Sequence, residues 1–171
     1  MKLKINFSAD RQFGEPLVKI LIDDYLTLYE GPVMDEHEFH CDIIDGTHEL
    51  KIIHYGKTKH DHIVDTNGSI IVDKHIEIKN IDIDDITLES ELWLGKFYPV
   101  YMHKKESDPI YISPNLYLGH NGAWILDFKT PAGNWLIDVR NSGPRLAGTI
   151  FRTNSELVNI AKDFFKDLPD V

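Results

Sequence analysis

Alternation of apolar and polar positions at a period of two dominates the first half of the chain and indicates β-strands with one buried face. The clearest examples are LKINF, PLVKILI and YLTLYEG, at residues 3–7, 16–22 and 25–31. Asp23-Asp24 separates the last two segments, which predicts a hairpin. A second hairpin is predicted between residues 38–44 and 48–54, about Asp45-Gly46-Thr47.

The segment IEIKNIDI changes the parity of its apolar positions halfway along. Ile76 and Ile78 share one parity, whereas Ile81 and Ile83 share the other. An uninterrupted strand would point the two pairs to opposite faces, because its side chains alternate. The pattern therefore predicts a bulge or break near Lys79-Asn80.

The second half continues the β pattern in short segments. These are FYPVYM, NLYLG, AWILDF and WLIDVR, the last two being separated by KTPAGN, which suits a hairpin loop. Many short strands between turn signals predict a mainly β protein, an antiparallel β-sandwich of the jelly-roll type. We expect a sandwich over residues 1–90, an aromatic-rich β extension over 91–152 that can belong to the same domain, and a C-terminal helix.

The predicted helix covers residues 153–168. Thr153-Asn154-Ser155-Glu156 has the spacing of a capping box, and Pro169 ends the segment. Its apolar residues then fall on one face at helical spacing: Leu157, Ile160, Ala161, Phe164, Phe165 and Leu168. This face would cover the protein's own domain or dock on a partner.

Composition narrows the class of protein. The 171 residues are 42% hydrophobic and carry a formal net charge of −10. No apolar run reaches the roughly 18 residues of a membrane span, and no signal peptide is evident, so we expect a soluble protein without a membrane partner. The acidic excess lies in the first half and repels phosphates, so no nucleic acid is expected as a partner. Cys41 is the single cysteine, which excludes an intramolecular disulfide.

Aromatic side chains gather in the second half and provide candidate stacking surfaces for sugars. The candidates for carbohydrate binding are Trp93, Tyr98, Tyr101, Tyr111 and Tyr117. Trp124 and Trp135 are different, because each shares parity with apolar neighbours. We predict that these two tryptophans lie in the core.

Candidate metal ligands come from a histidine-rich stretch. His60-Asp61-His62 would place two imidazoles on one face of a strand, with Asp65 nearby, which suits a divalent transition metal. The alternative is a polar loop with neutral histidines. No nucleophile elbow, phosphate-binding glycine loop or HExxH motif is present, so an enzyme is not expected. A small carbohydrate hydrolase with paired carboxylates is the catalytic alternative.

The segments PLVKILIDD, GTHELKIIHY and DKHIEIKNIDIDDI, within residues 16–86, resemble calcium-dependent xylan-binding carbohydrate modules. The resemblance implies a β-sandwich that binds polysaccharide, and it places an acidic calcium ligand on Asp73. Lys74-His75 replaces the Arg-Asn of the family motif, and His54-Tyr55 replaces an Asn-Asp pair. We therefore expect no cofactor, with calcium or a transition metal as the alternative.

A longer stretch, HYGKTKHDHIVDTNGSIIVDKHIEIKNIDID, resembles segments of small proteins from T4-like phages of marine bacteria and cyanobacteria. This resemblance implies a virion component made in the host cytoplasm. The expected function is a non-catalytic structural or attachment protein of a tailed-phage virion, bound to other virion subunits or to itself as a homo-oligomer. A soluble carbohydrate-binding module is the alternative.

Overall fold

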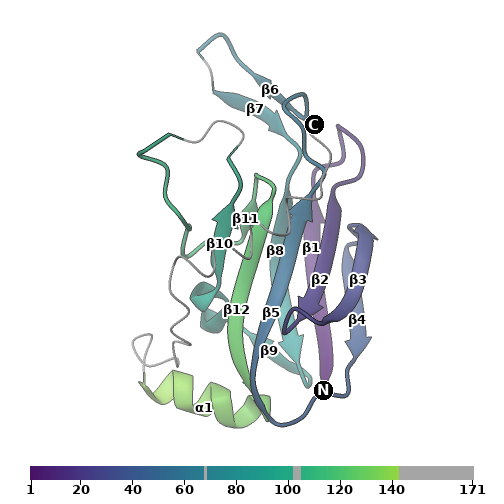
Figure 1. The fold of residues 1–171 in the computed structure, drawn as a ribbon, viewed down its shortest axis with the longest axis vertical. Helices are drawn as coiled ribbons and strands as arrows, with labels where there is room; N and C mark the ends of the chain where they lie inside the picture. Colours follow the sequence, from purple (N-terminus) through teal and green to yellow (C-terminus); the bar gives the residue numbers. More distant parts are fainter. Residues whose placement is uncertain (68, 102–104, 143–171) are drawn as a thin grey trace.

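Two five-stranded antiparallel sheets form a sandwich in the computed structural model, which describes residues 1–67, 69–101 and 105–142 (Figure 1). The first sheet contains β11 (Tyr117–Leu118), β8 (Ile76–Ile83), β1 (Lys2–Ala9) and β4 (Glu36–His40), with β9 (Ile86–Leu88) paired to β8. The second contains β10 (Lys96–Pro99), β12 (Gly122–Thr130), β5 (Gly46–Tyr55), β2 (Leu17–Ile22) and β3 (Leu26–Pro32). The mainly β sandwich predicted from the sequence is confirmed.

Among the described residues, one hairpin and two helical segments lie outside the two sheets. They are the hairpin of β6 (His62–Val64) and β7 (Ile70–Asp73), the 3₁₀ helix η1 (Ser90–Leu94) and the helix α1 (Ala132–Ser142). The β6–β7 hairpin projects from one end of the sandwich, whereas α1 lies at the other end (Figure 1). No helix among the described residues is long and apolar enough to cross a membrane.

Alternate side chains from the facing sheets form the core. Fully buried examples are Leu3, Ile5, Ile20, Ile52, Trp124 and Phe128. Each such side chain contributes roughly 1.5–3 kcal/mol relative to exposure. Trp124 and Trp135 are both buried, as predicted, although Trp135 lies on the helix α1 and not on a strand, so its burial does not follow from strand parity.

The predicted break in the isoleucine-rich strand is a bulge in β8. Asn80 lies opposite Asn6, but the next partner of β1, Phe7, lies opposite Ile78, so Lys79 is the additional residue. Lys79 is exposed. The bulge restores the parity of the strand, so that all four isoleucines of β8 face the core.

The first predicted hairpin is confirmed and the second is wrong. β2 and β3 pair across a three-residue loop, 23–25, in which Asp23 and Asp24 both have positive φ. In contrast, β4 pairs with β1 in one sheet and β5 lies in the other. The chain therefore crosses between the sheets over residues 41–45. Alternation shows that a segment is a strand but does not identify its neighbour.

The predicted strand WLIDVR is also wrong, because these residues belong to α1. Strand parity would bury Ile137 with Trp135, yet Ile137 is 59% exposed. The buried residues follow helical spacing instead: Ala132, Trp135, Leu136 and Val139. KTPAGN accordingly leads from β12 into a helix rather than forming a hairpin loop.

Strands from both halves of the chain pair with each other. β12 pairs with β5, and β11 pairs with β8, so residues after 90 contribute to both sheets. The proposed division of the chain at residue 90 stays a prediction. The predicted helix at 153–168 lies outside the described residues.

Candidate functional site

A pocket of about 810 Å³ is lined in part by the β6–β7 hairpin, which projects from one end of the sandwich (Figure 1). One side comes from the segment after β5, together with the hairpin. The other side comes from residues 97–101 at the end of β10 and from residues 112–120 around β11. The pocket thus lies where loops from both sheets meet, which is a common place for ligand sites in β-sandwiches.

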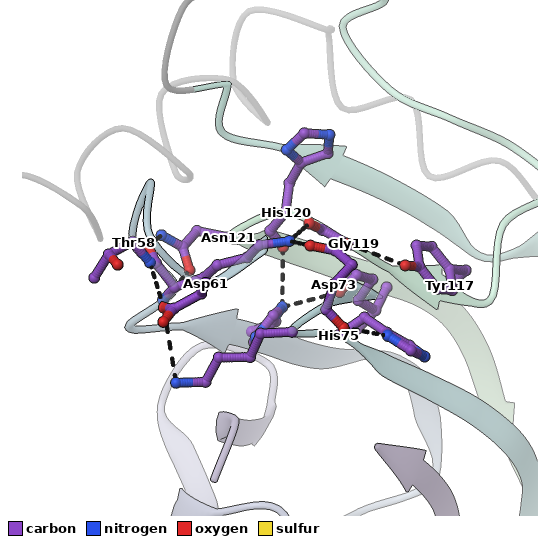
Figure 2. A network of polar contacts seen from close by, with 12 residues as sticks. Thr58, Asp61, Asp73, His75, Tyr117, Gly119, His120 and Asn121 are labelled. Carbon is purple, nitrogen blue, oxygen red and sulfur yellow. Dashed lines mark hydrogen bonds and ion pairs between the residues drawn. The ribbon is translucent and has the colours of Figure 1, made fainter. Parts of the chain in front are cut away.

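A buried ion pair forms the floor of this pocket. The Lys57 ammonium donates to the Asp73 Oδ1 and to the carbonyl oxygen of Gly119 (Figure 2). The Tyr117 hydroxyl donates to the second carboxylate oxygen, Asp73 Oδ2, at 3.0 Å. Lys57 and Asp73 are both nearly inaccessible to solvent. Both carboxylate oxygens therefore have partners, as a buried charge requires.

Backbone contacts hold Lys57 in place. Its amide N–H donates to the Asn121 Oδ1 at 2.9 Å, and the Asn121 amide donates back to the Lys57 carbonyl at 2.8 Å. The loop that follows is closed by Asp61, whose carboxylate accepts from the Thr58 N–H at 2.7 Å. The segment that carries the Lys57 ammonium is thus held by hydrogen bonds at Lys57 itself and in the loop that follows.

His54 lies beneath the floor and is fully buried. Its Nδ1 donates to the carbonyl oxygens of Leu118 and His120, at 3.0 and 3.1 Å. Because both partners are acceptors, the neutral ring must carry its proton on Nδ1. Burial, together with the nearby charge of Lys57, lowers the pKa of His54 to about 4. His54 is therefore a neutral structural group at neutral pH.

Aromatic rings form the exposed part of the wall. Tyr117 packs on His75, with ring centroids 4.5 Å apart, and Tyr101 packs on His120 at 5.2 Å. The Asn115 side-chain amide donates to the carbonyl oxygen of Tyr117 at 2.6 Å and so fixes the Tyr117 backbone. Burial and the adjacent Asp73 charge raise the pKa of Tyr117, so its hydroxyl remains a donor. Burial and Lys57 lower the pKa of His120.

The structure brings together two sets of residues that the sequence treats separately. Tyr101 and Tyr117, candidates for sugar binding, line the same pocket as His60, His62 and Asp73, candidates for metal binding. Sequence reasoning missed Lys57, Lys59, Asn115 and His120, which also line it. No local motif identifies them, because their roles depend on partners distant in the sequence.

The remaining candidates lie outside the pocket lining. Tyr98 is only 3% exposed and packs against Tyr111, with ring centroids 5.7 Å apart. Trp93 is 65% exposed on η1. Asp65 lies in the β6–β7 turn, where its Oδ1 accepts from the N–H groups of Asn67 and Ser69 at 2.8 Å.

The residues around Asp73 do not fit a calcium ion. Calcium takes six to eight oxygen ligands. Here one oxygen of Asp73 already accepts from an ammonium and the other from a hydroxyl. Within the described parts of the chain, no group of three or more His, Cys, Asp or Glu residues is arranged to hold a metal. Lys57 supplies the positive charge at this carboxylate.

Comparisons with known proteins find two similar solved structures. No protein-family model matches the sequence, and no curated protein matches it significantly. A structure of vCBM60 in complex with galactobiose aligns with a TM-score of 0.46 and 12% identity, over 75% of this chain and 98% of that one. A selenomethionine form of vCBM60 aligns with a TM-score of 0.48 and 9% identity, over 73% and 88%.

The vCBM60 module of the second structure is associated with a circular permutation that links two families of calcium-dependent carbohydrate-binding modules. The sequence resemblance described above also concerns calcium-dependent carbohydrate-binding modules, the class that this second structure's description names. The comparisons do not address the phage context, which stays a prediction.

Calcium is expected to leave the stability of the protein unchanged. At about 5 mM calcium, the melting temperature should move by less than about 2 °C, because the described residues offer no ligand set that would bind the ion to the folded state. Differential scanning calorimetry with calcium and with a chelator measures this. A calcium-dependent rise of several degrees that the chelator reverses would contradict the assignment of Lys57 as the cation at Asp73.

Stability is expected to depend on pH through His54. Between pH 6.5 and about 4, His54 binds a proton in the unfolded chain but stays neutral in the folded protein. The free energy of unfolding therefore falls as the pH falls through this range. The total loss in the free energy of unfolding is about 3 kcal/mol, and it is reached near the pKa of His54 in the folded protein. His54→Asn keeps a donor for the two carbonyls and removes the titration.

Urea unfolding of both proteins at neutral and at acid pH measures this contribution. The pKa values of His37 and His120 are also lowered, and these two residues contribute with the same sign to both proteins. The wild type should therefore lose more stability on acidification than His54→Asn does. Equal losses of stability in the two proteins would show that His54 does not cause the pH dependence.

Proposed function

We propose that the protein binds carbohydrate in the pocket at the end of the sandwich. The proposal depends on the presence of both Tyr101 and Tyr117 in the wall of one pocket, above a fixed polar floor. Sugars present alternating apolar and hydroxyl-bearing faces, so aromatic rings beside hydrogen-bonding groups suit them. Tyr117 is 44% exposed and thus offers a ring face to a ligand.

The polar groups of the wall suit the hydroxyls of a sugar. His60, His62 and Lys59 line the pocket and provide donors and acceptors around the tyrosines. The floor supports this arrangement, because the Tyr117 hydroxyl is fixed by Asp73 and its backbone by Asn115. A pre-ordered wall lowers the entropy lost on binding.

Binding, rather than hydrolysis, is the function that this pocket supports. Glycoside hydrolysis needs two carboxyl groups that flank the scissile bond. Of the described lining residues only Asp73 carries one, and it is paired with Lys57. A place in a tailed-phage virion, with virion subunits or a second copy as partner, is an additional proposal that rests on the sequence resemblance. Glycan binding would suit an attachment role of that kind.

Removal of one pocket tyrosine should weaken glycan binding while removal of a matched exposed tyrosine should not. We expect Tyr101→Ala to lower the affinity about tenfold, which corresponds to about 1.4 kcal/mol. Tyr25→Ala is the control, since Tyr25 is 78% exposed in the β2–β3 turn and does not line the pocket. Affinity electrophoresis against a panel of soluble polysaccharides finds the ligand, and titration calorimetry compares the variants.

The comparison of the two tyrosine variants shows whether the glycan binds in the pocket or elsewhere on the surface. Equal weakening by Tyr101→Ala and Tyr25→Ala would place the binding elsewhere. Failure of the wild type to bind any polysaccharide of the panel would contradict the proposed function.

A further inference from the structure

The pocket differs in charge from the protein as a whole. The chain has a net charge of −10, yet the described lining residues include two lysines, three histidines and a single carboxylate. These groups are Lys57, Lys59, His60, His62, His120 and Asp73. The net negative charge of the protein repels anions. Any attraction of anions to this pocket must therefore come from the residues that line it.

Internal partners engage only part of these groups. Lys57 is balanced by Asp73 in the floor. Lys59 is exposed and, within the described parts of the chain, has no ion-pair partner. The ring nitrogens of His60, His62 and His120 likewise make no hydrogen bond to any described residue. These groups remain for a ligand.

Nearby carboxylates outside the lining have partners of their own. Asp61 accepts from the Thr58 N–H and lies 3.8 Å from the Lys74 ammonium. Asp108 accepts from the Lys105 N–H at 2.6 Å. The charge of Asp108 reaches His120 and Tyr101, where it raises the pKa of each group. It therefore favours the protonated form of His120 and offsets part of the effect of Lys57.

We propose that the pocket selects an anionic saccharide, which carries a carboxylate or a sulfate. Its acidic group would contact Lys59 and the histidines, while its ring packs on Tyr101 and Tyr117. This inference rests on the proposed function and adds the class of ligand. Hydrogen bonds between a cationic donor and an anion are about twice as strong as neutral ones, so the acidic group adds affinity as well as specificity. A neutral sugar leaves Lys59 without a charged partner.

Two matched pairs of polysaccharides test the charge of the ligand. Polygalacturonate is compared with its methyl ester, which keeps the sugar and removes the charge, and dextran sulfate is compared with dextran. We expect at least one charged polymer to bind about tenfold more tightly than its neutral partner, a difference of about 1.4 kcal/mol. The pair that shows the difference distinguishes a carboxylate from a sulfate.

Two lysine variants test where the charge acts. Lys59→Gln removes a charge at the pocket, and Lys129→Gln removes one from an exposed site near the opposite end of β12. Lys59→Gln should weaken binding of the charged polymer about fivefold and weaken binding of a neutral polymer much less, because glutamine removes the charge but keeps a hydrogen-bond donor. Lys129→Gln should change neither. Circular dichroism of both variants shows that they are folded.

The outcomes distinguish this inference from the proposed function. Binding of neutral and charged polymers with equal affinity would overturn the anionic specificity and leave carbohydrate binding in place. Equal weakening by the two lysine variants would also overturn it, since a general charge effect would then explain the preference. If no polymer is bound, both the inference and the proposed function fail.

Discussion

The Lys57 ammonium, held by Asp73 and by the carbonyl of Gly119, is the interaction on which the pocket depends. It joins three parts of the chain: the segment after β5, the end of β7 and the loop between β11 and β12. Burial of two charges is costly unless each is hydrogen-bonded, so the positions of these segments are coupled. A change in one of them would leave an unpaired charge in the interior.

Several properties of the site follow from this ion pair. Asp73 fixes the Tyr117 hydroxyl and helps to keep it protonated, since its charge raises the pKa of the phenol. The Lys57 charge helps to keep His54 neutral beneath the floor. Because the cation is covalently part of the chain, Asp73 has a permanent partner at any metal concentration. The wall above can then present aromatic rings, the Lys59 ammonium and the histidine ring nitrogens to a ligand.

The sequence predicts features that depend on neighbouring residues better than those that depend on distant ones. The parity change in β8 identifies the bulge at Lys79, and Asp23-Asp24 identifies the first hairpin. By contrast, residues 135–140 read as a strand because so short a segment does not separate the two periods. Lys57 resembles an ordinary solvated lysine in sequence, because its partners lie 16 and 62 positions away. The sequence identifies Tyr101, Tyr117, His60 and His62 as candidate site residues, but only the fold shows that they line one pocket.

A double-mutant cycle between Lys57 and Asp73 tests the central claim most directly. Lys57→Met and Asp73→Asn each leave one buried partner unmatched, and each should lower the free energy of unfolding by about 3–5 kcal/mol. Together they remove both charges, so the double variant should be more stable than the sum predicts, with a coupling energy above about 2 kcal/mol. Losses that add to within about 0.5 kcal/mol would show that the two side chains act independently, which would contradict a pocket floor built on their ion pair.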